Sequence, residues 1–179
     1  MILKMEEASE ENDINWAHKM SLIDRLKGLS SSLLLSCRTI ILEATRGEME
    51  QDEAKADLDR YHVGDRIVFC VDIPAEGHMA IFHGDPNGQV SWVFPASPSD
   101  DTSVMAGTEK RVAGTVTGPP GRHFLKAIYT KKPLVNPEEI DFEDEKDQER
   151  TIPEFIRSVD SLEPAAWQTT IYEFEVIEH

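Results

Sequence analysis

The chain has 179 residues, of which 40% are hydrophobic and 29% are charged, the composition of a soluble globular protein long enough to bury a core. Its formal net charge is −16 and its pI is near 4.7. Proteins that bind nucleic acids or anionic membranes use clusters of Lys and Arg, and no basic stripe occurs here. We therefore expect neither nucleic acid nor membrane among its partners.

The first 32 residues are predicted to form an N-terminal helical arm. The stretch NDINWAHKMSLIDRLKGL (12–29) carries apolar residues at helical spacing, and Gly28 and the serines that follow end the pattern. This helix either packs on the rest of the protein or ends a linker to something upstream. There is no signal peptide pattern, and the longest apolar run, LLL at 33–35, is too short to span a bilayer. The expected location is the cytoplasm, unless the chain is a fragment of a longer protein.

From residue 33 onward, most apolar stretches have the pattern of strands. The first, LLLSCRTIILEA (33–44), is predicted to be a buried strand. Alternating stretches bounded by Gly and Pro predict the others, at 61–74, 78–83, 89–94, 109–116 (an edge strand), 117–133 and 167–179. In the last of them Ile171, Phe174 and Val176 are the expected core residues.

Two acidic segments interrupt the strands, at 48–59 and 137–149, and both are predicted to be solvated loops. The first also has the composition of a short helix. A short amphipathic helix is expected at 152–164, with Pro153 in its first turn. These elements indicate a mainly β domain over residues 33–179. We predict an antiparallel immunoglobulin-like β-sandwich of about seven strands, with an N-terminal helix and a short helix before the last strand.

The middle of the chain, residues 61–133, has a characteristic order of turn and core motifs: Gly64-Asp65, Ile81-Phe82, Asp85 with Gly88, Phe94-Pro95, and Pro119-Pro120-Gly121. This order resembles the bacterial family of domains of unknown function DUF4384. The chain has Gly77-His78 where the family usually has Gly-Tyr. The resemblance implies an immunoglobulin-like accessory module, of the kind often attached to caspase-like peptidases, protein kinases or other signalling and envelope proteins. It implies no catalytic residues.

Three groups of residues could carry chemistry. The loop Asp85-Pro86-Asn87-Gly88 could offer oxygen ligands to calcium, but it has one carboxylate, and the geometry of a turn explains each residue. His62, His78, His83 and His123 lack the spacing of a zinc site, although strands distant in sequence could bring them together. Cys37 and Cys70 could form a disulfide, and two buried free thiols are the favoured alternative. We predict no metal and no cofactor.

The best candidates for an interaction surface are two tryptophans. Trp16 lies on the predicted N-terminal helix and Trp92 on a predicted strand, where core packing is the competing interpretation. The sequence favours a non-enzymatic β-sandwich module that mediates protein–protein interaction, with another protein or a second copy of itself as partner. The alternative is a sandwich domain that binds a small molecule, peptide or carbohydrate. A hydrolase with a site built from loops 97–108 and 117–123 is the less favoured form of this alternative.

Overall fold

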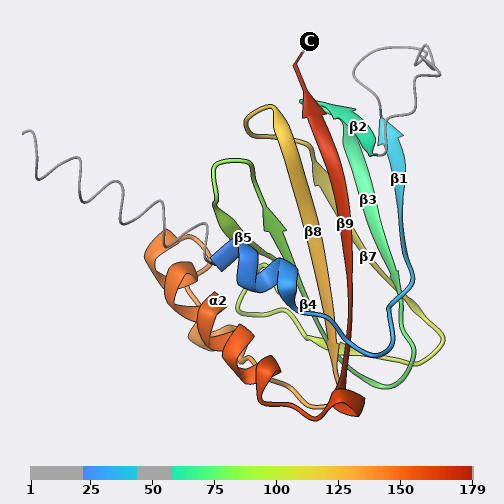
Figure 1. Cartoon of the computed structure of the whole chain (residues 1–179), viewed down its shortest axis with the longest axis vertical. Coiled ribbons are helices and arrows are strands. Elements are labelled where there is room, and N and C mark those ends of the chain that lie inside the picture. The colour runs from blue at the N-terminus through green and yellow to red at the C-terminus, as the bar shows by residue number, and fades with distance from the viewer. Residues whose placement is uncertain (1–21, 44–57, 179) are drawn as a thin grey trace, which may run out of the picture.

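A computed structural model describes residues 22–43 and 58–178, and the fold is mainly β, with two sheets and two helices (Figure 1). The smaller sheet has three strands in the order β1-β3-β7, namely β1 (Cys37–Glu43), β3 (Arg66–Asp72) and β7 (Glu109–Thr115). The larger sheet has the order β2-β9-β8-β4-β5, with β6 beside β4. Its strands are β2 (Asp59–His62), β4 (Gly77–Gly84), β5 (Val90–Phe94), β6 (Ser103–Val104), β8 (Gly121–Thr130) and β9 (Trp167–Ile177).

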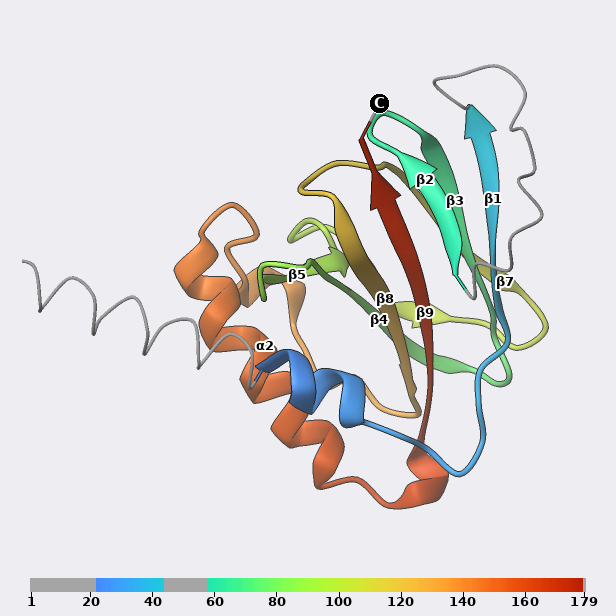
Figure 2. The same cartoon turned by 45° about the horizontal axis from the view of Figure 1, so that its top comes forward.

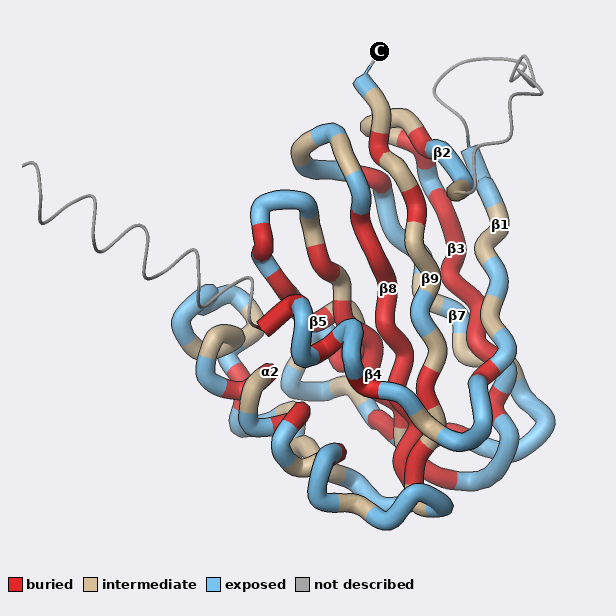
Figure 3. Tube along the Cα trace, in the orientation of Figure 1, coloured by how far each residue is buried: buried red, intermediate tan, exposed pale blue. Residues whose placement is uncertain are grey.

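The large sheet forms the middle layer of the molecule. One of its faces packs on the small sheet, and α2 (Glu145–Asp160) and the helical residues 22–28 cover the other face (Figure 2). Two hydrophobic clusters fill these interfaces. Ile67, Ile81 and Phe174 belong to the cluster between the sheets, and Phe82, Trp92 and Ile156 belong to the cluster under the helices. Because both of its faces are covered, the middle of the large sheet is the core of the fold, and β8 is buried over most of its length (Figure 3).

The sandwich-like arrangement of two sheets was predicted, but the number of strands was not. The described residues hold nine strands instead of about seven, and the additional ones are β2, with four residues, and β6, with two. All other strand pairs are antiparallel, whereas β2 pairs with β9 in parallel. Short strands like these carry too few alternating residues to be recognised from sequence.

The helix before the last strand begins earlier than predicted, at Glu145 instead of residue 152. Asp144 is its N-cap and accepts a hydrogen bond from the backbone N–H of Lys146, and acidic residues in the first turn interact favourably with the helix dipole. The second acidic segment is therefore not simply a solvated loop, because its end starts α2 and residues Pro137–Glu139 form the 3₁₀ helix η1. Pro153 lies inside α2, not in its first turn. A second 3₁₀ helix, η2 (Pro164–Ala166), leads into β9.

Residues 22–29 pack on the large sheet, so this part of the predicted N-terminal arm docks on the domain. Leu22, Leu26 and Leu29 are buried, as the helical spacing predicted. The ammonium group of Lys126, on β8, is also buried beneath this helix and donates a hydrogen bond of 2.5 Å to the carbonyl oxygen of Leu29. Residues 1–21 and 44–57 lie outside the described part of the chain, as do Trp16 and most of the first acidic segment.

Two burial predictions were wrong. β1 was expected to be a buried strand, but it pairs only with β3 in the described part of the chain, and Ile41 and Leu42 are exposed. In β9, Phe174 and Val176 are buried as predicted, whereas Ile171 is 36% exposed. Among the described residues, no helix is both long and apolar enough to cross a bilayer.

Candidate functional site

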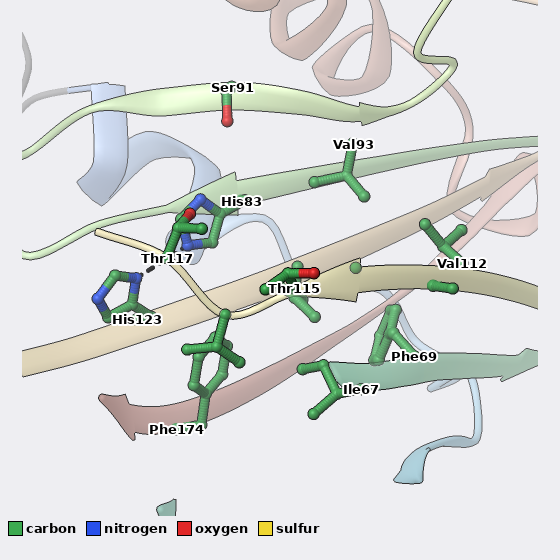
Figure 4. Close-up of a pocket in the computed structure, with 14 residues that line it drawn as sticks. Ile67, Phe69, His83, Ser91, Val93, Val112, Thr115, Thr117, His123 and Phe174 are labelled. Carbon is green, nitrogen blue, oxygen red and sulfur yellow. Dashed lines mark hydrogen bonds between the residues drawn. The ribbon is translucent and has the colours of Figure 1, made fainter. Parts of the chain in front are cut away.

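The two sheets separate along the side where β5 and β7 form their edges, and a cleft opens between them (Figure 4). Its cavity has a volume of about 200 Å³. Apolar side chains from both sheets line most of it, among them Ile67, Phe69, Val93, Val112, Leu125 and Phe174. The polar residues of the lining are Ser91, Thr115, Thr117 and the two histidines His83 and His123.

A contact between a cation and an aromatic ring joins the two sheets near the cleft. The inward-facing Lys110 of β7 places its ammonium nitrogen 3.4 Å from the centre of the Phe94 ring, which holds β7 against β5 at this point. Further along β7, the next inward positions are Val112 and Gly114. A Cβ atom placed on Gly114 would meet nothing within 4 Å. Gly114 is an exposed residue of the cavity lining, so β7 leaves open space beside this part of the cleft.

His83 and His123 form a hydrogen-bonded pair in the wall of the cleft. His83 lies on β4 and His123 on β8, and the contact joins His83 Nε2 to His123 Nδ1 at 2.9 Å (Figure 4). Their rings are stacked, with centroids 5.1 Å apart. His123 is also bonded through Nε2 to the carbonyl oxygen of Pro119, at 2.9 Å. The loop before β8 is thus tied to β4 through two imidazole rings.

The carbonyl of Pro119 fixes the direction of both hydrogen bonds. A carbonyl oxygen can only accept, so His123 Nε2 carries the proton and donates. With neutral rings, His123 Nδ1 then accepts from His83 Nε2, and His83 Nδ1 is left as an acceptor. His83 Nδ1 makes no hydrogen bond within the described part of the chain. Because every fully buried polar side-chain atom there has a partner, this nitrogen is not fully buried and is accessible to a ligand.

Burial keeps His83 neutral at physiological pH. Desolvation, and secondly the neighbouring His123, lower the pKa of His83 to about 4, although Asp85 acts in the opposite direction. No Asp, Glu, Lys, Arg or Cys lies among the residues that line the cavity. The cleft thus offers an apolar surface with neutral hydrogen-bonding groups, and it has no charge with which to bind an ion.

The four histidines considered as metal ligands do not come together. His83 and His123 meet, but His78 contacts the hydroxyl of Thr102 at 3.0 Å, and His62 lies on β2. Within the described ranges, no group of three or more His, Cys, Asp or Glu side chains is placed to hold a metal ion. Cys37 and Cys70 are both free thiols.

The loop between β4 and β5 has the geometry of a turn, which is the interpretation that the sequence favoured over a calcium site. Asp85 Oδ1 accepts hydrogen bonds of 2.9 Å from the backbone N–H groups of Asn87 and Gln89. Gly88 has a φ of 87°, a conformation that favours glycine. The carboxylate of Asp85 is thus used to hold its own loop.

Trp92, one of the two candidates for an interaction surface, lies in the core. It is 8% exposed, packs against Phe82 and Phe155 under α2, and donates from Nε1 to the hydroxyl of Thr151 at 3.1 Å. Core packing, the competing interpretation, therefore describes Trp92. Sequence reasoning considered His83 and His123 only as metal ligands and missed their pairing, for which it had one signal, their positions on strands that could be neighbours.

Comparison with known families adds one finding. Residues 60–133 match the family described as Domain of unknown function (DUF4384). This confirms the resemblance seen in the sequence. The matched DUF4384 region runs from the end of β2 to just beyond β8, so it supplies β7, β5, both histidines and Gly114. No curated protein matches the chain, and no solved structure does.

Proposed function

We propose that this chain is a non-enzymatic binding module that takes an extended segment of a partner protein along the edge of β7, over the mouth of the cleft. The observation that carries this proposal is the position of a regular, unpaired strand edge directly beside an apolar cavity. Extended peptides commonly bind by adding a strand to such an edge, with pockets for alternate side chains providing specificity.

The backbone of β7 is available along its outer edge in the described part of the chain. Val116 donates to the carbonyl oxygen of Asp65, and Ile73 donates to that of Thr108, so even-numbered residues of this segment direct their backbone groups toward β3. The odd-numbered residues Arg111, Ala113 and Thr115 therefore direct theirs away from β3. A partner strand could form hydrogen bonds with these groups without disturbing the small sheet.

The other strand edges are less suited to this role. The register of β1 with β3 is interrupted between Ile41 and Glu43, whereas β7 pairs with β3 without interruption. On β5, the backbone N–H of Trp92 already donates to the side chain of Gln148 at 3.2 Å. β2 has only four residues. β7 is the edge that combines length, regularity and a neighbouring cavity.

The residues of the cleft favour binding over catalysis. Ser91 lies opposite His83 in the register of β4 and β5, the arrangement from which a serine nucleophile and its base could be built. No hydrogen bond joins the two in the described structure, and His83 is oriented by another histidine instead of a carboxylate. A histidine whose pKa is about 4 is also a poor general base at neutral pH.

The test is strand addition to β7. Peptides selected from a phage-displayed library of random linear sequences should perturb the backbone amide NMR signals of β7. Ala113→Pro should abolish this binding without unfolding the protein, because proline is tolerated where the N–H points away from the sheet. Ala113→Ser keeps the N–H and is the matched control. Selected peptides that bind the proline variant as tightly as the serine variant would refute the proposal.

Several further expectations are part of this proposal. Two packed sheets of antiparallel strands, with connections that cross from one sheet to the other, support an immunoglobulin-like relationship, whereas the parallel pair β2–β9 is an addition to it. The formal net charge of −16 supports a protein partner over nucleic acid, and a cytoplasmic location is a further part of the proposal. A second copy of the chain could also occupy β7, and light scattering tests this. If the chain forms a dimer that Ala113→Pro dissociates, the partner on β7 is a second copy of the chain and not another protein.

A further inference from the structure

The cavity in the cleft has the size of one aromatic ring. Its volume is about 200 Å³, whereas pockets for drug-sized ligands and cofactors begin near 300 Å³. An apolar protein cavity of about 150 Å³ is known to be large enough for benzene. The space therefore fits a single substituted ring and is too small for a nucleotide or another large cofactor.

The polarity of the lining selects among such rings. Most of the wall is apolar, and no charged side chain belongs to it, so a neutral ring is favoured. Because the Pro119 carbonyl fixes both protons of the histidine pair, His83 Nδ1 is an acceptor without a partner in the described part of the chain. A ligand that carries a hydrogen-bond donor satisfies this nitrogen, and a purely hydrocarbon ring leaves it unpaired.

We propose that the cavity binds a phenolic ring, either the side chain of a tyrosine in an extended partner segment or a free phenol, whose hydroxyl donates to His83 Nδ1. The ring packs between Phe174 of β9 and Val93 of β5, in the space left open by Gly114. A phenol is neutral at pH 7, which suits the uncharged lining. The first source of the ring rests on the function proposed above, and the second does not.

The first experiment uses the smallest probes. The binding of p-cresol and of toluene to the whole chain is measured by NMR titration of the backbone amides of Ser91 and Gly114. We expect saturable binding of both, with p-cresol bound about fivefold more tightly, the equivalent of one hydrogen bond. His83→Leu should remove this preference. Equal affinities of the two probes for the original chain, or no saturable binding of either, would overturn the proposal.

A pair of substitutions on β7 tests the location. Gly114→Val should fill the cavity and reduce p-cresol binding at least tenfold. Arg111→Val places the same apolar side chain on the outward face of the same strand, at an exposed residue outside the lining of the cavity, and is the matched control, for which we expect unchanged affinity. An unchanged affinity in the folded Gly114→Val protein would place the probe elsewhere and refute the assignment.

A third experiment distinguishes the two sources of the ring. The blocked peptide acetyl-Val-Tyr-Val-amide is compared with its Phe analogue and with p-cresol, on the original chain and on Ala113→Pro. If the ring belongs to a partner protein, the tyrosine peptide binds more tightly than p-cresol and loses that advantage in Ala113→Pro. If p-cresol binds selectively while the peptide gains nothing, the cavity takes a free phenol and strand addition is wrong.

Discussion

The lysine buried beneath the N-terminal helix makes a testable contribution to stability. Lys126 is 2% exposed, and its ammonium group donates to the carbonyl oxygen of Leu29. Burial lowers its pKa from 10.5 to about 8. We expect Lys126→Met to change the dependence of the free energy of unfolding on pH, because methionine keeps much of the apolar packing and removes the titrating group.

The sign of the effect follows from proton binding. Between pH 8 and pH 10.5 the unfolded chain holds a proton on Lys126 that the folded protein has released, so raising the pH over this range favours the folded state. A difference of about 2.5 pKa units corresponds to about 3 kcal/mol over the whole range. Between pH 7.5 and pH 10, about 2 kcal/mol of this gain is realised.

The measurement is urea unfolding at pH 7.5 and pH 10, followed by tryptophan fluorescence. Other groups titrate over this range in both proteins, so the relevant quantity is the difference in unfolding free energy between the original chain and the variant. That difference should shift by about 2 kcal/mol in favour of the original chain at the higher pH. A difference independent of pH would mean that Lys126 is not desolvated under the helix.

Three further substitutions probe the packing and the cleft. Leu26→Ala should lower the free energy of unfolding in urea by about 2–5 kcal/mol, because Leu26 is fully buried on the sheet-facing side of the N-terminal helix. Lys27→Ala removes an exposed ion pair and should lower it by less than about 1 kcal/mol. Equal losses would contradict docking of the helix. Trp92→Phe and Thr151→Val, combined in a double-mutant cycle, should show a coupling of about 1 kcal/mol from the indole hydrogen bond, and additive effects would refute it. For His83, the folded pKa of about 4 lies below the unfolded value, so stability should fall as the pH drops from about 6.5 to 4, by at most about 3 kcal/mol. His83→Gln should flatten this part of the pH profile, and an unchanged profile would show that the ring is solvated.

The pattern of hydrophobic residues predicted where the strands lie in the sequence better than it predicted their burial and their positions in the sheets. The apolar members of the 117–133 stretch, Phe124, Ala127, Ile128 and Tyr129, are all buried in β8, because a central strand with both faces covered is apolar on both. The same reasoning failed for β1, whose apolar run suggests burial although it lies at a sheet edge. Position within a sheet depends on long-range pairing, which local patterns do not encode.

The start of α2 could have been predicted from local residues. Asp144 is followed three positions later by Asp147, and acidic residues at such positions are typical of a helix N-terminus. The density of negative charge in this segment led to the prediction of a solvated loop, although Asp144 and Asp147 also fit the start of a helix. In the structure, Asp147 accepts from the backbone N–H of Asp141, and the same charges anchor the beginning of the helix.

The candidate site could not have been assembled from sequence. His83 and His123 are separated by 40 residues, and their contact depends on the register that places His83 opposite Leu125. The cavity depends in addition on which strands form the edges of the two sheets. The match to DUF4384 covers both histidines, but a resemblance carried mainly by turns and core residues supports the fold and assigns no site.

The contacts that join the two sheets differ between the two lateral edges of the sandwich. On the side of β1 and β2, the hydroxyl of Thr39 lies 2.8 Å from that of Tyr61 and 2.9 Å from that of Tyr172, and these contacts join the two sheets. On the side of β5 and β7, the ammonium group of Lys110 lies over the Phe94 ring, and the inward position that follows Val112 is a glycine.

Gly114 should make the protein less stable than a larger apolar residue at this position would. Gly114 has no positive φ and borders open space beside the cleft, so valine at this position can cover part of the apolar lining and suits a strand. Gly114→Val should therefore raise the free energy of unfolding by about 1–2 kcal/mol, and by more than the control Arg111→Val, in the same protein that loses p-cresol binding. A gain in stability together with a loss of p-cresol binding would show that Gly114 keeps the cavity open for a ligand at the expense of stability. A destabilised Gly114→Val protein would instead show that the space is not available to a side chain, and the cleft would lose its standing as a ligand site.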